Sequence, residues 1–159
     1  MCIRDSNETR RLVHVLRTEA ADGALAPQPG LAQLDALVEQ VRATGLRAEL
    51  TITGRPFPVP EGAQLAGYRI VQEALTNTLK HARHATRVHA ALRYTDDAIE
   101  IGVTDDGEPP VAAPVEVTGH GLVGMRERAA LYDGTVSAGP RAGGGWAVRA
   151  RLEVSPSLV

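Results

Sequence analysis

The stretch QEALTNTLKHA, residues 72–82, combines good helix formers with several polar and charged side chains. It lies in the longest segment of helical spacing in the chain, at about 62–83. At about 100° per residue, one face of this helix is apolar. That face carries Ile70, Val71, Ala74, Leu75, Leu79 and Ala82. The opposite side carries Glu73, Asn77, Lys80 and His84, with His81 at its edge.

This polar side has two interpretations. A solvated face is the usual one for an amphipathic helix. Asn77 argues against it, because Asn is a poor helix former and no cap is needed at mid-helix. An amide oxygen one turn from the Glu73 carboxylate suits Mg²⁺, which takes one or two protein oxygens and leaves its other positions to phosphate and water. Lys80 and His81 would then meet the phosphates.

The elements around this helix predict an α/β fold. Two further helices are expected over 30–45 and 122–134, and strands over 48–53, 86–94, 98–104, 135–139 and 146–154. This order is typical of a two-layer sandwich, a mixed β-sheet covered on one face by about three helices. Residues 105–121 are rich in Gly and Pro and are expected to form a long loop, which in a compact domain usually acts as a lid or binding loop.

Composition sets outer limits on the function. The chain has 159 residues, 43% hydrophobic and 23% charged, which fits one globular domain with a real core. A net charge of −2 gives no reason to expect a direct nucleic-acid partner. The single cysteine excludes an intrachain disulfide, and no apolar run approaches the roughly 20 residues that cross a bilayer. We therefore expect a cytoplasmic location.

The N-terminal residues are expected to lie outside the domain. Residues 1–6, MCIRDS, show no periodicity and are expected to be non-native sequence. Residues 7–20 include a short helical stripe, and 21–30 form a linker rich in Gly and Pro. The domain is expected to span 31–155, in a chain that begins inside a longer protein.

Two more motifs carry chemistry. In VTDDG, residues 103–107, Asp105 ends a strand and could accept a hydrogen bond from an exocyclic amino group. Adenine offers such a donor at N6, whereas guanine offers an O6 acceptor, so a carboxylate would select adenine. In GHGLVGMRER, residues 119–128, Gly119 and Gly121 precede an expected helix, and backbone N–H groups at a helix start bind phosphate. Taken singly, DDG and GxG are also common turn signals.

Together, RIVQEALTNTLKHA, VTDDG and GHGLVGMRER resemble the N box and the two glycine boxes of bacterial sensor histidine kinases. The sequences of these motifs most resemble those of the subfamily whose response regulators carry helix-turn-helix domains. The resemblance covers about residues 30–153. It implies a Bergerat-type (GHKL) ATP-binding catalytic domain that holds ATP and Mg²⁺ beneath a lid at 108–120. Residues 7–20 would be the tail of a dimerisation helix.

The resemblance also implies roles for single residues. Asn77 would ligate Mg²⁺, and Glu73 would be catalytic, holding a metal-bound water or polarising the reaction. Lys80 and His81 would approach the phosphates. Asp105 would bind the adenine amino group, and Gly107 would leave room for the base. The phosphate loop would involve Gly119, Gly121, Leu122 and Gly124.

The implied activity is transfer of the γ-phosphoryl group of ATP to a histidine. His14 is followed by Val15 where an acidic residue is expected, so the acceptor should lie on an upstream dimerisation domain that this chain lacks. The chain alone is expected to bind nucleotide without autophosphorylation. The implied partners are that phosphoacceptor domain, in a homodimer, and a response regulator. The whole protein could be a membrane-bound sensor with this portion in the cytoplasm.

Two departures from the family pattern leave alternatives open. Pro109 stands where the first glycine box usually ends in Gly, and Pro cannot take the positive φ open to Gly. The last strand lacks the Gly-Thr that many relatives carry, and GGG at 143–145 is interpreted only as a tight turn. The alternatives are a non-catalytic nucleotide-binding or interaction module and an anti-sigma-factor serine kinase of the same fold.

Overall fold

A computed structural model describes residues 28–108 and 115–154, and for residues 115–121 it describes the backbone alone. Its helices and strands are, in chain order, the 3₁₀ helix η1 (Leu31–Gln33), α2 (Leu34–Arg42), β1 (Arg47–Thr53), α3 (Glu61–His81), β2 (Arg87–Tyr94), β3 (Ala98–Asp105), α4 (Val115–Ala130), β4 (Thr135–Pro140) and β5 (Trp146–Glu153). The expected segments 1–6 and 7–20 and most of the linker lie outside the described residues.

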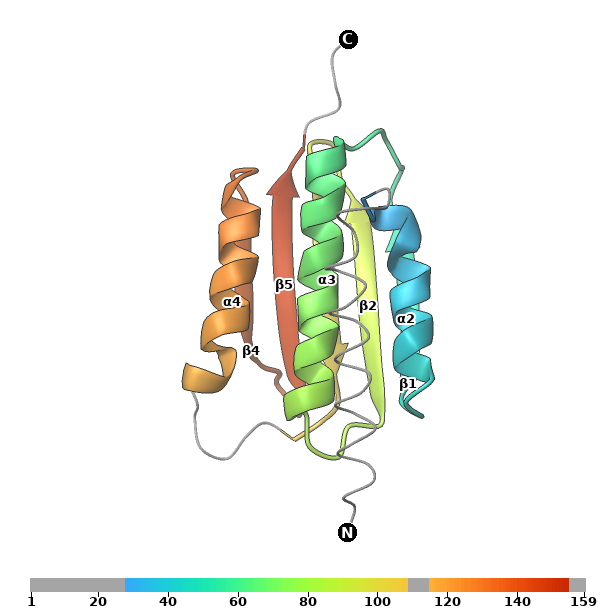
Figure 1. Ribbon diagram of the computed structural model, residues 1–159, viewed down its shortest axis with the longest axis vertical. Helices are drawn as coiled ribbons and strands as arrows, with labels where there is room; N and C mark the ends of the chain where they lie inside the picture. The colour runs from blue at the N-terminus through green and yellow to red at the C-terminus, as the bar shows by residue number, and fades with distance from the viewer. Residues whose placement is uncertain (1–27, 109–114, 155–159) are drawn as a thin grey trace.

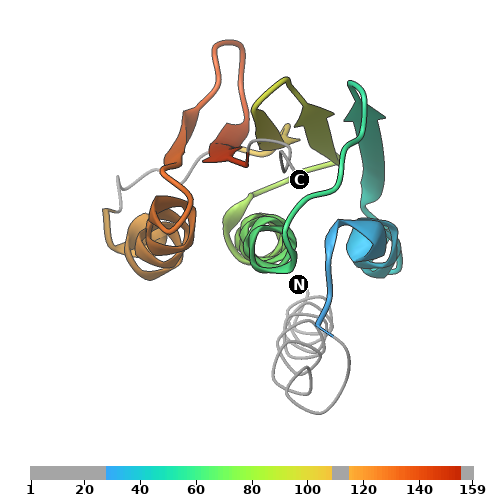
Figure 2. The same cartoon turned by 90° about the horizontal axis from the view of Figure 1, so that it is seen from above.

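The five strands form one mixed sheet in the order β1-β2-β3-β5-β4. β1 lies parallel to β2, and the other three neighbouring pairs are antiparallel. Helices α2, α3 and α4 all pack on one face of the sheet, with α3 in the middle (Figure 1, Figure 2). The predicted two-layer α/β sandwich is therefore confirmed. Within the described ranges, no helix is long and apolar enough to span a lipid bilayer.

Alternation of apolar and polar residues decides which face of each strand meets the helices. In β3, Ile99, Ile101 and Val103 are buried, whereas Glu100 is partly exposed. The buried residues of β5 lie directly opposite them in register and are Val148, Ala150 and Leu152. The two strands thus present one continuous apolar surface to α3.

Helix α3 is buried around most of its circumference, because it lies between the sheet, α2 and α4 (Figure 2). Gly67 allows its close approach to the sheet. A Cβ atom at Gly67 would lie 3.1 Å from Cδ2 of Leu31 and 3.2 Å from Cδ1 of Ile101. A larger residue would therefore push the helix away from both η1 and β3.

Several element ends meet at one end of the sheet, here called the Asp105 end. Asp105 closes β3 and lies in register with Val88 of β2 on one side and Trp146 of β5 on the other. The C-terminal end of α3 and the start of α4 lie at this same end (Figure 1). Motifs far apart in the sequence therefore share one edge of the molecule.

The structure corrects the expected loop over residues 105–121. Helix α4 begins at Val115, so Gly119 and Gly121 lie inside a helix and not in a turn before it. Glycine costs about 1 kcal/mol relative to alanine within a helix, which weakens a helix without stopping it. Proline is the stronger breaker, and α4 begins directly after Pro114.

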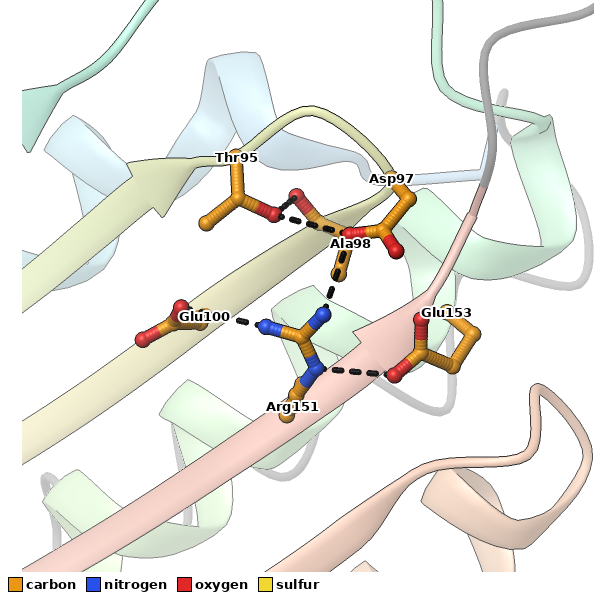
Figure 3. Close-up of polar contacts among 6 residues, drawn as sticks. All are labelled: Thr95, Asp97, Ala98, Glu100, Arg151 and Glu153. Atoms are coloured by element: carbon orange, nitrogen blue, oxygen red, sulfur yellow. Dashed lines mark hydrogen bonds and ion pairs between the residues drawn. The ribbon is translucent and has the colours of Figure 1, made fainter.

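At the opposite end of the sheet, one guanidinium joins three carboxylates (Figure 3). Arg151 donates from Nε to Glu153 over 2.8 Å and from Nη1 to Glu100 over 3.2 Å. Its Nη2 donates to Asp97 over 3.0 Å. Asp97 belongs to the β2–β3 turn, in which the Thr95 hydroxyl also donates to a backbone carbonyl. The cluster therefore ties this turn to the end of β5.

Candidate functional site

The polar side of α3 is neither fully solvated nor fully buried. Glu73 and Asn77 are partly buried, and Lys80 is exposed. His84, expected on the same helix side, lies beyond the end of α3 at His81 and has a positive φ of 57°. Its placement on that helix side was wrong, because α3 ends three residues before His84. Glu73 and Asn77 therefore do not belong to a fully solvated face, and their contacts with a metal ion stay predictions.

Asp105 is a buried carboxyl that contacts α3. It is 4% exposed, and Thr78 of α3 donates from its hydroxyl to Oδ2 over 3.2 Å. The backbone N–H of Gly107 donates to Oδ1 over 2.9 Å. Burial raises the pKa of Asp105, and these hydrogen bonds oppose the rise because they favour the carboxylate. The contact of Asp105 with adenine stays a prediction.

Asp106 anchors the backbone of the same turn. Its carboxylate accepts the N–H groups of Thr86 over 2.8 Å and Arg87 over 3.0 Å, and it also accepts the Thr86 hydroxyl. Desolvation opposes the charged form, but these hydrogen bonds outweigh it and lower the pKa of Asp106 to about 2. No role for Asp106 was predicted, although Asp before Gly often accepts hydrogen bonds from backbone N–H groups in a turn.

Gly107 brings the turn after β3 against the segment after α3. A Cβ atom there would lie 2.9 Å from Cβ of Ala82 and 3.1 Å from the carbonyl oxygen of Arg83. Arg83 and Glu108 also exchange two backbone hydrogen bonds, of 2.7 and 3.4 Å. On this side, the space left by Gly107 is therefore occupied by the chain itself, and room for a base stays a prediction.

The β4–β5 loop folds onto the same strand end. Residues 143–145 all have positive φ, and a Cβ atom at Gly145 would lie 2.0 Å from the carbonyl oxygen of Asp105. Arg141 donates from Nη1 to that same oxygen over 3.4 Å. The three glycines do form a tight turn, as expected. The packing of this loop against Asp105 was not predicted, and neither was the position of Trp146, which follows Gly145 in the chain.

The residues of the second glycine box lie in α4, namely Gly119, Gly121, Leu122 and Gly124. Leu122 packs partly buried against the apolar core. A Cβ atom at Gly124 would meet only the far end of the Arg128 side chain, at 3.1 Å. The start of α4 lies at the Asp105 end of the sheet, near the end of α3 (Figure 1). The contacts of these four residues with phosphate stay predictions.

Lys80 and His81 both lie in the last turn of α3. Burial lowers the pKa of His81, and the charge of Lys80 lowers it further, so both effects favour the neutral imidazole. Among the side chains of residues 28–108 and 122–154, no three His, Cys, Asp or Glu gather to hold a metal. The hard oxygens on this side of α3 are those of Glu73 and Asn77, one turn apart, which suits an ion that keeps phosphate and water in its shell.

The sequence matches one known family over most of this fold. Residues 62–156 match the family described as histidine kinase-, DNA gyrase B- and HSP90-like ATPases. The chain belongs to this family. Among similar curated proteins is the signal transduction histidine-protein kinase/phosphatase DegS of Brevibacillus brevis, 32% identical over 127 residues, which are 80% of this chain and 32% of DegS.

A second relative, the sensor histidine kinase YxjM of Bacillus subtilis, is 34% identical over 134 residues, which are 82% of this chain and 30% of YxjM. The chain thus spans about a third of the length of these relatives. Among solved structures, the mycobacterial sensor histidine kinase MprB aligns with a TM-score of 0.57 and 21% identity, over 77% of this chain and 93% of that one. The blue-light activated histidine kinase of Erythrobacter litoralis aligns at 0.60 and 20%, over 93% and 47%.

Proposed function

We propose that this chain is the ATP-binding catalytic portion of a cytoplasmic or membrane-bound sensor histidine kinase. The observation that carries the proposal is the hydrogen bond from Thr78 to Asp105. Asn77 directly precedes Thr78 in α3, so the residue that would ligate the metal is next in the chain to the residue that contacts Asp105. A nucleotide whose base meets Asp105 would then have its phosphates directed toward α3 and the start of α4.

The base would be held by Asp105. A buried carboxylate can accept from the exocyclic amino group of adenine, and it would repel the O6 acceptor of guanine. The hydrogen bonds from Thr78 and Gly107 fix both carboxylate oxygens in place. We therefore expect selectivity for ATP over GTP.

The phosphates and metal would lie beside the polar side of α3. Asn77 would ligate Mg²⁺, which neutralises phosphate charge, while Lys80 and His81 would contact phosphate oxygens. In the transfer, the bond between the γ-phosphorus and the bridging oxygen breaks as the acceptor histidine nitrogen attacks, and ADP leaves. Glu73 would polarise this step or hold a metal-bound water. Such transfer depends on positioning and charge stabilisation.

The acceptor histidine would be supplied by an upstream dimerisation domain, and the phosphoryl group would pass on to an aspartate of a response regulator. The relatives are sensor histidine kinases by name, which favours this proposal over an anti-sigma-factor serine kinase of the same fold. Transfer of the phosphoryl group to an acceptor domain would distinguish a kinase from a non-catalytic nucleotide-binding module.

Calorimetry with ATP and GTP, each with and without Mg²⁺, tests the binding step. We expect ATP·Mg²⁺ to bind, GTP to bind much more weakly, and Asp105→Ala to lose ATP binding. Asp96→Ala, in the exposed turn at the far end of the sheet, is the matched control and should bind as the unaltered chain does. Asn77→Ala should remove the Mg²⁺ dependence. Absence of ATP binding, or full binding by Asp105→Ala, contradicts the proposal.

The transfer step needs a purified phosphoacceptor domain of a related kinase. With γ-labelled ATP, we expect acid-labile label on that domain, and Glu73→Gln should slow its appearance while leaving ATP affinity nearly unchanged. Nucleotide binding without any transfer to a series of acceptor domains would identify a non-catalytic module.

A further inference from the structure

Trp146 is the only tryptophan in the chain, and it lies directly opposite Asp105. Residues in register on antiparallel strands point to the same face of a sheet. In β5, Val148 and Ala150 face the helices, so alternation places Trp146 on that face too. Asp105 shares this face, because it continues the buried row of β3. The indole and the carboxyl are therefore neighbours on the helix-covered side.

Trp146 stands where the apolar layer ends. The next pair inward, Val103 and Val148, is buried, whereas Trp146 is partly exposed and packs only in part against the core. A large aromatic side chain normally buries most of its area, so a partly open indole beside a buried carboxyl has surface left to contact something else.

The position of Trp146 is fixed by its neighbours. Gly145 lies tightly against the Asp105 carbonyl, which Arg141 also contacts. The backbone N–H of Trp146 favours the charged form of the Asp105 carboxyl by hydrogen bonding. The loop is closed by the bond from the Arg141 N–H to the Gly145 carbonyl, over 2.9 Å. These contacts hold the backbone at the start of β5, and with it the position of the indole.

We propose that Trp146 forms an aromatic wall of the base site and packs against the purine whose amino group donates a hydrogen bond to Asp105. This inference rests on the proposed function. Every purine has an apolar π-face, and base–aromatic contacts are tolerant of base identity. We therefore expect Asp105 to determine which purine binds and Trp146 to add affinity for any purine.

The test begins with the unaltered chain, because selective excitation of a single indole reports on one position. Titration with ATP·Mg²⁺ should change the fluorescence and saturate with the dissociation constant found by calorimetry. Trp146→Leu should weaken ATP binding by about 5- to 100-fold, and Trp146→Phe should retain it within about threefold. The ratio of ATP to GTP affinity should stay unchanged in Trp146→Leu and should fall in Asp105→Asn.

Phe57→Leu is the matched control. Phe57 packs edge-to-face on Tyr94, with ring centroids 5.6 Å apart, and Tyr94 ends β2 at the far end of the sheet from Asp105. Removing that ring should leave ATP affinity unchanged. Thermal unfolding of each variant shows whether it folds.

The outcomes separate the two proposals. ATP binding that neither alters the fluorescence of Trp146 nor weakens in folded Trp146→Leu overturns the aromatic wall and leaves the proposed function standing. If the ratio of ATP to GTP affinity changes in Trp146→Leu, Trp146 also affects base selectivity, and the separate roles proposed for Trp146 and Asp105 are wrong. If the unaltered chain binds no ATP, both proposals fail together.

Discussion

Thr78 of α3 donates a hydrogen bond from its hydroxyl to the carboxylate of Asp105 at the end of β3, over 3.2 Å. Both residues are buried, at 7% and 4% exposure. A buried carboxyl without donors would be costly, so this contact makes the position of Asp105 tolerable as well as fixed. The stability of the sheet end and the candidate base site therefore depend on the same bond.

Thr78→Val should destabilise the fold and weaken ATP binding together. Valine keeps the shape but removes the donor, and a hydrogen bond to a charged group contributes about 1.5–3 kcal/mol. Urea denaturation would measure the loss, and calorimetry would measure the affinity. Thr78→Ser retains the hydroxyl and should lose much less of both. Equal behaviour of the Val and Ser variants would show that the hydroxyl contributes nothing.

Asp105→Asn should stabilise the fold near neutral pH. Burial raises the pKa of Asp105 in the folded state, so the stability that this carboxyl contributes is fully present below its ordinary pKa of 3.8 and is lost as pH rises through the folded pKa. The uncharged amide avoids that loss. The gain should therefore appear above the folded pKa and disappear below 3.8, in denaturation curves collected across the acid range.

Asp106→Asn should have the opposite effect. Its folded pKa is lowered to about 2, so its contribution to stability is fully present above 3.8 and is lost as pH falls toward 2. The variant should be less stable than the unaltered chain at neutral pH, and the two should converge in acid. Shifts of the same sign in these two neighbouring aspartates would contradict the contrast between a buried carboxyl and a hydrogen-bonded anchor.

Only part of this arrangement could be predicted from the sequence. Periodicity is local, so it located five strands and the helices that cover them. The identity of the site residues came from three motifs that resemble a known family. The hydroxyl of Thr78 was missed because a threonine on a helix carries no sign of the partner it meets, which here lies 27 positions away in the chain.

The order of the strands in the sheet could not be predicted from the sequence either. β5 inserts between β3 and β4, which places Trp146 beside Asp105, and no local pattern distinguishes this from a sheet in chain order. The start of α4 was misjudged for another reason. Two glycines suggested a turn, but a glycine costs a helix only about 1 kcal/mol, and the remaining residues after Pro114 outweigh that.

Gly107→Ala should destabilise the fold by about 1–3 kcal/mol, because the added methyl overpacks a tight contact. Its Cβ would lie 2.9 Å from Cβ of Ala82 and 3.1 Å from the carbonyl oxygen of Arg83. Gly139→Ala is the matched control, since a Cβ there meets nothing within 4 Å. Denaturation midpoints would compare the two. Equal losses would mean that the turn after β3 moves freely to accept a side chain.

Arg151→Met should destabilise the fold in a salt-dependent way and leave ATP affinity unchanged. Methionine keeps the apolar stem but removes the contacts with Asp97, Glu100 and Glu153, which are left as three neighbouring carboxylates (Figure 3). All four groups are substantially exposed, so added salt screens both the lost attraction and the new repulsion. The difference from the unaltered chain should therefore shrink as salt rises.

Arg149→Met is the control for this last prediction. Arg149 lies two residues away in β5, is exposed, and forms no ion pair with the residues that the structure describes. The Arg149→Met substitution removes one positive charge from β5, as Arg151→Met does, but breaks no ion-pair cluster. Thermal unfolding at low and high salt should separate the variants, with Arg151→Met alone gaining stability relative to the unaltered chain as salt is added. Identical salt dependence would assign the effect to net charge, and altered ATP affinity in Arg151→Met would connect the two ends of the sheet.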